Sequence, residues 1–255
     1  RLSDDASSTD LREWLVERQR SWNDLHDRQS LPTVSRRELK QHASSDATTD
    51  ASDASVDILL TPGSHPEHLR TTLRTVLAQD HPRWHLLVLD DEVSSRVRSV
   101  LDEELEPETW TMVEVAGAGG PAGFERALAS GHGEWLAFLT AGDLWAPDRL
   151  LQLLARAGRT GAEAVADVMK FVRDDETSYL SRAGIGAEKP TRRSGIAAER
   201  LMLQRSAVDM LGIASDLAAG WEFDLLARIT QRTGVPLVPA IGVTRHLERW
   251  REAKW

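Results

Sequence analysis

Acidic side chains stand at the ends of two short apolar runs of the sequence. Asp90 and Asp91 follow the run 84–89, and Asp143 follows a second run after a turn of small residues. Short apolar runs bounded by turn residues are typical of parallel strands that are covered on both faces. In open α/β sheets, ligands bind beyond the carboxyl ends of such strands. We therefore expect a polar ligand at residues 140–143. We also expect the paired aspartates to face solvent, a cation or hydrogen-bond donors, because buried carboxylates are otherwise costly.

The order of apolar runs and helical patterns predicts an α/β fold. A strand at 56–60, a helix that begins at Ser64 and a strand at 84–89 form one unit. Such a unit is expected to be a right-handed crossover between parallel strands. The remaining predicted strands are 110–115, 135–139, 164–172 and 236–244, and the remaining predicted helices are 93–105, 124–130, 147–157 and 221–232.

A stretch with almost no apolar side chains to bury separates the N-terminal part of the chain from the predicted domain. Residues 43–55 consist entirely of Ser, Thr, Asp and Ala, which is the composition of a linker. Before it, residues 10–29 have the spacing of an amphipathic helix. The predicted parts are therefore an N-terminal helical extension (1–42), the linker (43–55), one globular domain (56–246) and a C-terminal tail (247–255).

Composition excludes several classes of function. The chain has 255 residues and a formal net charge of −9, which argues against nucleic acid or an anionic membrane surface as the main partner. It has no cysteine, so disulfides, thiolate zinc sites and a cysteine nucleophile are excluded. No apolar run approaches the roughly 20 residues of a transmembrane helix. We expect a cytoplasmic protein, and the start at Arg1 suggests a piece of a longer chain with neighbouring domains.

Three stretches in this order resemble the family 2 glycosyltransferases of the GT-A fold. Residues 56–92 resemble the opening strand, helix and Asp-Asp strand end of that family. Residues 131–150 resemble the segment that carries its Asp-x-Asp motif, and residues 220–246 resemble its catalytic-base helix and closing strand. The resemblance covers 56–246 and implies a GT-A-like, Rossmann-type α/β/α sandwich with a mostly parallel central sheet.

The resemblance also implies a function. The family members transfer a sugar, with inversion, from a nucleotide-sugar donor to an acceptor hydroxyl, such as that of a glycan. A divalent cation, Mn²⁺ or Mg²⁺, and the Asp-x-Asp motif hold the donor diphosphate. A hard cation suits this role because the leaving diphosphate gains negative charge. A nearby carboxylate takes the proton of the attacking hydroxyl.

Carried over to this sequence, the resemblance assigns a role to each matching residue. It makes Glu222 the catalytic base. It assigns donor binding to Thr61, Asp90, Asp91, Asp143 and Arg245, and metal binding to Asp143 and His246. Structural alternatives stay open at this point: a capped turn for the paired aspartates, a helix N-terminal acid favoured by the macrodipole for Glu222, and a surface position for His246.

The sequence departs from the family pattern at the position of the metal. Thr140 and Gly142 stand where the family usually has aspartates, so Asp143 alone remains of the acidic block. One Asp and one His make a thin shell for a hard cation, which prefers several oxygen ligands. We therefore expect metal affinity to be low.

Two functions from different classes remain open. In the first, the domain is an active transferase. Lys189, Arg192, Arg193 and Arg245 then replace part of the charge of the metal, and the long segment 173–194 closes over the donor. In the second, it is a catalytically inactive glycosyltransferase-like domain that serves as a scaffold or interaction module of a larger protein. Dinucleotide-binding, phosphate-loop and hydrolase motifs are absent from the sequence.

Overall fold

The computed structural model describes residues 53–63, 65–90, 95–115, 120–173, 177–181, 198–214 and 221–247. The predicted N-terminal extension and most of the predicted linker lie outside the described residues, as does all but the first residue of the predicted tail. Asp91 and most of the predicted loop 173–194 also lie outside them.

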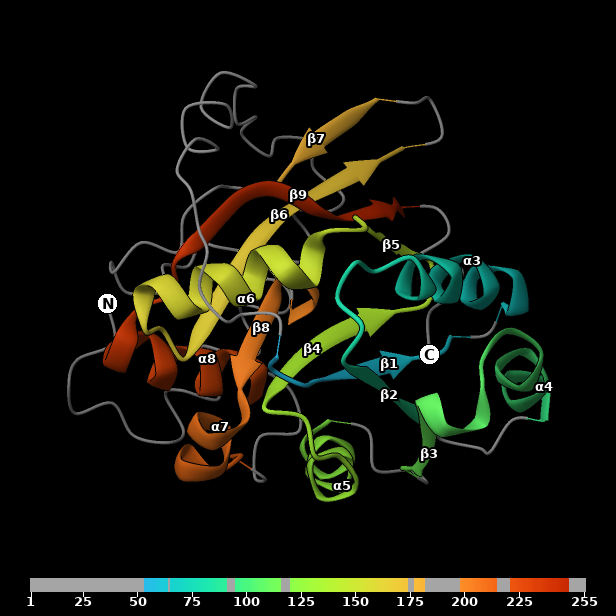
Figure 1. Cartoon of the computed structure of the whole chain (residues 1–255), viewed down its shortest axis with the longest axis horizontal. Helices are drawn as coiled ribbons and strands as arrows, with labels where there is room; N and C mark the ends of the chain where they lie inside the picture. The colour runs from blue at the N-terminus through green and yellow to red at the C-terminus, as the bar shows by residue number, and fades with distance from the viewer. Residues whose placement is uncertain are drawn as a thin grey trace, which may run out of the picture.

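Helices and strands alternate along the first half of the domain and are mixed in the second half (Figure 1). The strands are β1 (Val56–Thr61), β2 (Trp84–Asp90), β3 (Trp110–Glu114), β4 (Trp135–Thr140), β5 (Asp143–Trp145), β6 (Ala164–Val172), β7 (Ser178–Leu180), β8 (Leu201–Gln204) and β9 (Leu237–His246). The α-helices are α3 (Pro66–Leu77), α4 (Ser95–Glu104), α5 (Pro121–Ser130), α6 (Arg149–Thr160), α7 (Arg205–Leu211) and α8 (Trp221–Thr233), and the 3₁₀ turns are η1 (Pro107–Thr109) and η2 (Ala198–Arg200).

The described strands form one nine-stranded sheet in the order β3-β2-β1-β4-β8-β6-β9-β5, with β7 on β6. The four strands from β3 to β4 are parallel to one another, and β6 is parallel to β9. The pairs β4–β8, β6–β8, β6–β7 and β5–β9 are antiparallel. The sheet is therefore mixed, with a parallel half that corresponds to the predicted crossover units.

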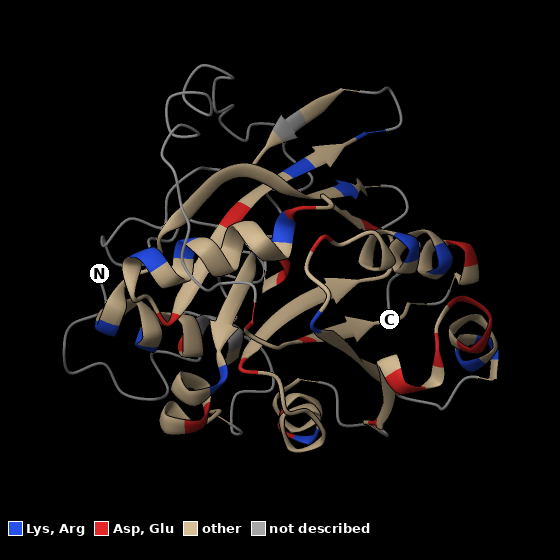
Figure 2. Ribbon diagram, viewed as in Figure 1, with Lys and Arg blue, Asp and Glu red and all other residues tan. Residues whose placement is uncertain are grey.

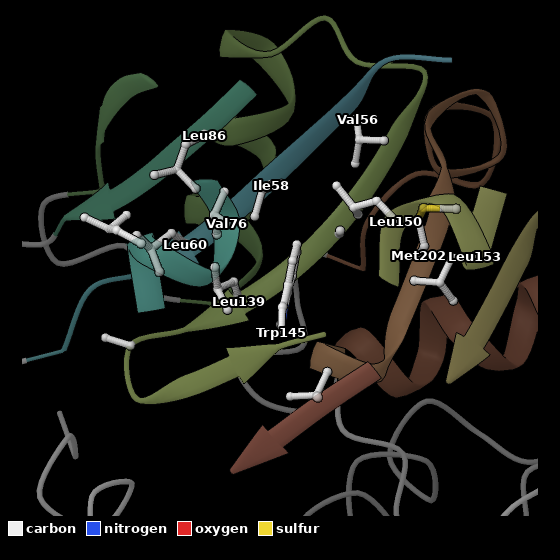
Figure 3. Close-up of a cluster of buried hydrophobic side chains, with 14 of the residues drawn as sticks. Val56, Ile58, Leu60, Val76, Leu86, Leu139, Trp145, Leu150, Leu153 and Met202 are labelled. Carbon is white, nitrogen blue, oxygen red and sulfur yellow. The ribbon is translucent and has the colours of Figure 1, made fainter. Parts of the chain in front are cut away.

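The central strands β1, β2 and β4 are buried on both faces, as their continuous apolar runs predict. In β1, Ile58 and Leu60 belong to one core and Leu59 to the other, because successive side chains of a strand point to opposite faces. The first core contains Leu86 of β2 and Leu139 of β4, and Figure 3 shows these side chains together with those of β1. The strands β1, β2 and β4 thus each contribute to both cores.

Helices cover the two faces of the sheet in two groups. The first core is closed by the buried faces of α3, α4 and α6, and the second by those of α5, α7 and α8 (Figure 1). In α6 the buried residues Leu150, Leu153, Leu154 and Ala157 recur at helical spacing. The predicted α/β/α sandwich is confirmed.

A buried carboxylate ties β1 to the segment before β4. Asp57 accepts a hydrogen bond from the backbone N–H of Gly133 at 2.8 Å and forms an ion pair with Arg205. Arg205 also donates to the carbonyl oxygens of Gly133 at 2.6 Å and Leu128 at 2.9 Å. A Cβ atom at Gly133 would lie 2.8 Å from the carboxylate carbon of Asp57, so only glycine leaves room for this contact.

We predict that Gly133→Ala lowers the free energy of unfolding by about 1–3 kcal/mol, the usual cost of forcing an extra methyl group into a packed site. Gly158 lies in the exposed part of α6, and a Cβ atom there meets no other atom within 4 Å. Gly158→Ala is the matched control and should raise stability by roughly 0.5–1 kcal/mol, because alanine favours a helix over glycine. Urea denaturation of both variants checks this, and a Gly133→Ala protein as stable as the parent would contradict it.

Polar side chains of α3 and of the residues just after it bind the turn that follows β4. Thr72 accepts from the backbone N–H of Gly142 at 2.9 Å and donates to the carbonyl oxygen of Asp143 at 2.8 Å. Gln79 donates to the carbonyl oxygen of Ala146 at 2.8 Å and accepts from the N–H of Leu150 at 3.2 Å. These bonds fix the backbone of residues 142–150 against the helix, and they set where the side chain of Asp143 points.

Candidate active site at the carboxyl edge of the sheet

Five buried charged side chains and one partly buried one gather where β5, β6, β9, α6 and η2 meet. Each of the six forms a hydrogen bond or an ion pair with the side chain or the backbone of another member. Figure 2 marks the charged positions on β6, α6 and β9 among strands that are otherwise largely uncharged. We call this group the rim cluster, and its members are Asp143, Arg149, Asp167, Glu199, Arg200 and Arg245.

Arg245 is the centre of the outer half of the cluster. Its Nε donates to Oδ1 of Asp143 at 2.7 Å, and one terminal nitrogen donates to Oδ2 at 2.6 Å. The same nitrogen lies 2.7 Å from Oε1 of Glu199. Asp143 and Arg245 face each other in the antiparallel pair β5–β9, so the strand register itself brings them together. Both oxygens of Asp143 are thus occupied by one guanidinium group.

Glu199 connects this pair to the end of β4. Its Oε1 accepts from the hydroxyl of Thr140 at 3.0 Å as well as from Arg245. Burial alone would raise the pKa of Glu199, but Arg245 outweighs burial and holds that pKa below its usual value. For Arg245, burial acts to lower the pKa, and the two carboxylates of Glu199 and Asp143 raise it above its usual value. The guanidinium group therefore stays charged.

Arg149 and Asp167 form the inner half of the cluster. Nε of Arg149 donates to Oδ2 of Asp167 at 2.6 Å, and a terminal nitrogen donates to the carbonyl oxygen of Glu199 at 2.7 Å. The guanidinium carbon lies 4.2 Å from the ring centroid of Trp145, within cation–π range. A Cβ atom at Gly242 would overlap the carboxylate of Asp167, so a glycine in β9 makes room for the pair.

Arg200 completes the inner half by donating to the carbonyl oxygen of Asp167 at 2.8 Å. Burial lowers the pKa of Arg200 to about 10, against the opposing effect of Asp167. Burial also raises the pKa of Asp143 and of Asp167, and the neighbouring arginines oppose it. With three carboxylates and three guanidinium groups, the cluster has no net formal charge.

The structure brings some of the predicted site residues together. Thr61 is the register partner of Thr140 at the ends of β1 and β4, and Asp90 ends the neighbouring strand β2. Asp143 and Arg245 are both predicted donor-binding residues, and they bind each other. The side chains of Asp90 and Glu222 lie outside what the structure describes, although the backbone of Glu222 is the second residue of α8.

The two predicted metal ligands, Asp143 and His246, lie on different sides of β9, and their role in metal binding stays a prediction. Both oxygens of Asp143 accept from Arg245. His246 follows Arg245 in β9, so its side chain points to the opposite face of the strand from the Asp143–Arg245 pair. Among the described residues, no group of three or more His, Asp or Glu side chains is arranged to hold a metal ion.

Sequence reasoning missed four members of the cluster: Arg149, Asp167, Glu199 and Arg200. Asp167 gave a usable signal, because a carboxylate inside the apolar run 164–172 requires a buried partner. The sequence around Glu199 has no periodicity that would place it next to β4 and β9. Its position depends on how the chain returns to the sheet after residue 197.

A family model described as Glycosyl transferase family 2 matches residues 64–208, which is more than half of the chain. The chain belongs to glycosyltransferase family 2. The match contains five members of the rim cluster and ends before Arg245 and Glu222. The predicted family is confirmed.

Curated proteins related to this family 2 chain match it over short stretches. The succinoglycan biosynthesis protein ExoW of Rhizobium meliloti (strain 1021) is 30% identical over 102 residues, which cover 38% of this chain and 32% of ExoW. TuaG of Bacillus subtilis (strain 168), named for teichuronic acid biosynthesis, is 27% identical over 86 residues, which cover 33% of this chain and 34% of TuaG. The chain thus spans about a third of the length of these relatives.

Solved glycosyltransferase structures share the fold of this family 2 chain. TarS 1-349 of S. aureus in complex with UDP gives a TM-score of 0.55 at 13% identity, over 75% of this chain and 60% of that one. The complex of TarS 1-349 with UDP-GlcNAc gives 0.54 at 13% identity, over 75% and 58%. At this identity the likeness concerns the fold. None of the helices in the described part of the chain is long and apolar enough to span a bilayer.

We predict that Asp167→Ala lowers the free energy of unfolding by about 3–5 kcal/mol, because it leaves Arg149 buried without its carboxylate. The double variant Arg149→Met/Asp167→Leu should recover most of this loss. Arg232→Ala is the control, since the Arg232–Glu163 pair is partly exposed and such pairs contribute about 1 kcal/mol or less. Guanidinium denaturation measures all three, and equal losses for Asp167→Ala and Arg232→Ala would contradict the prediction.

Proposed function

We propose that this domain is the catalytic module of an inverting glycosyltransferase that binds a nucleotide-sugar donor at the carboxyl edge of the parallel strands. The sugar passes to an acceptor hydroxyl, and a nucleoside diphosphate leaves. Family membership supports the reaction class. The TarS structures with UDP and UDP-GlcNAc support a nucleotide sugar as donor and make uridine the first nucleotide to test.

The observation that carries the proposal is that the ends of β1, β2 and β4 and the start of α8 lie near one edge of the sheet. Thr61 and Thr140 end adjacent strands, and Asp90 ends the next one. Trp221 begins α8 and packs on Phe124 with ring centroids 4.5 Å apart. Phe124 also stacks on Phe138, two residues before the end of β4. The start of α8, and with it the backbone of Glu222, therefore lies near the edge where Thr61 and Asp90 end.

The proposed chemistry requires one base at this edge. In our proposal, the Glu222 carboxylate accepts the proton of the acceptor hydroxyl while the hydroxyl oxygen bonds to the anomeric carbon. The bond from that carbon to the diphosphate oxygen breaks in the same step, and its electron pair leaves with the diphosphate. The first turn of α8 suits an ionised carboxylate, because the helix macrodipole favours negative charge there.

The diphosphate requires positive charge, and the rim cluster is neutral. We assign this role to Lys189, Arg192 and Arg193, as the sequence suggested. Arg193 precedes Glu199 by six residues in the sequence. Arginine suits the role because its planar fork binds phosphate oxygens in pairs.

A scaffold without turnover is the second candidate. The mutual pairing of Asp143 and Arg245 favours it, because two residues predicted to contact the donor are occupied by each other. In that case the fold is retained and the domain serves an interaction within a longer protein.

Calorimetry with nucleoside diphosphates and their sugars separates the two candidates. An active module should bind at least one donor, either with EDTA or with Mn²⁺ present, and should release nucleoside diphosphate from it. Glu222→Gln should keep donor binding and reduce turnover at least 100-fold, since general-base catalysis contributes about that much or more.

Asp224→Asn is the matched control, because Asp224 lies in the same helix and pairs with Arg228 at 2.7 Å. This variant should keep turnover within a few-fold of the parent. Absence of donor binding both with EDTA and with Mn²⁺ would favour the scaffold. Equal turnover of Glu222→Gln and the parent would remove Glu222 as the base.

A further inference from the structure

Two carboxylates from distant parts of the chain converge on one nitrogen atom of Arg245. That nitrogen lies 2.6 Å from Oδ2 of Asp143 and 2.7 Å from Oε1 of Glu199. Asp143 comes from β5 and Glu199 from η2, and both are largely buried. Two buried carboxylates at one point require a cation between them, because like charges in a poorly solvated site destabilise each other.

We propose that the guanidinium group of Arg245 takes the place that a divalent cation would otherwise have at this position, so that the rim of this glycosyltransferase domain works without a metal ion. The proposal rests on the geometry of Arg245, Asp143 and Glu199. Only its consequence for donor binding rests on the proposed function.

The guanidinium group is held in place by the sheet. Arg245 is the register partner of Asp143 in β5 and of Phe171 in β6, so its backbone is paired on both sides. A metal ion at Asp143 would have to displace the whole guanidinium group, which would then be buried without its two carboxylates. That displacement is costly, because an uncompensated buried charge destabilises the fold.

Two other residues at the turn between β4 and β5, Thr140 and Gly142, suit a guanidinium group at Arg245 and provide no carboxylate for a metal ion. Thr140 provides a hydroxyl that donates to Glu199, where a carboxylate would repel it. Gly142 has a φ of 100°, a backbone conformation that side-chain-bearing residues rarely adopt. An aspartate at that position would therefore be strained. The turn leaves Asp143 and Glu199 as the acids that face Arg245 among the described residues.

Removal of Arg245 should expose a latent cation site. Arg245→Ala leaves the carboxylates of Asp143 and Glu199 facing a gap, with oxygen ligands of the kind that Mn²⁺ and Mg²⁺ prefer. We expect Arg245→Ala to melt below the parent protein and to regain about 5–10 °C in Tm at MnCl₂ concentrations near 100 times the Kd. The parent protein should show no change in Tm and no bound Mn²⁺ by electron paramagnetic resonance.

Two variants make the test specific. Arg205→Ala is the matched control, because Arg205 pairs with the single carboxylate of Asp57; it should lose stability and gain nothing from Mn²⁺. Arg245→Ala/Asp143→Asn should lose the response to Mn²⁺. If Arg245→Ala does not fold without metal, its refolding with and without MnCl₂ gives the same answer.

Three results would overturn the proposal. They are stoichiometric Mn²⁺ binding by the parent protein that Asp143→Asn abolishes, a folded Arg245→Ala variant that is indifferent to Mn²⁺, and an equal Mn²⁺ response of Arg205→Ala. These measurements need no donor. A failure to bind any nucleotide sugar would therefore count against the proposed function alone, whereas donor binding by the parent that requires Mn²⁺ would count against the present inference alone.

Discussion

The pairing of buried charge at the carboxyl edge constrains the second half of this domain. Charges are costly to bury unless each has a partner, and the rim cluster provides one for every member. Its ion pairs join β5 to β9 and α6 to β6, and η2 contributes Glu199 and Arg200. Such pairs contribute little net stability compared with apolar packing. Removal of one partner, however, strongly destabilises the fold, because the other charge stays buried without compensation. The cluster therefore fixes the relative positions of these segments more than it stabilises them.

The two halves of the sheet are built by different means. In the parallel half, β1, β2 and β4 bury apolar side chains on both faces, and the helices between them close the two cores. Beyond β4 the sheet combines antiparallel pairs with the parallel pair β6–β9. Hydrogen bonds from Thr72 and Gln79 join the turn after β4 to α3. The rim cluster therefore lies next to the boundary between the regular parallel half of the sheet and its mixed half.

The same division explains what the sequence could predict. Strands such as 56–60 and 164–172 are visible as local apolar runs, and helix α6 is visible as a local amphipathic pattern. Asp143 was recognisable as a site residue from its place after a strand. Its partner Arg245 lies 102 residues away, and only the β5–β9 register sets their meeting. A pattern read along the chain contains no information on that register, so both residues were predicted to face the donor.

A buried Asp–Arg pair does not by itself indicate a functional site, as Asp57 and Arg205 show. There the second partner of the carboxylate is the backbone N–H of Gly133, and Arg205 uses its other donors on carbonyl oxygens. At the rim, the arginine instead meets a second carboxylate, that of Glu199. A pair that only joins two strands does not need this additional negative charge, which the inner arginines must offset. A pair of acids around one cation is the arrangement of a metal site, and here a side chain of the protein provides that cation.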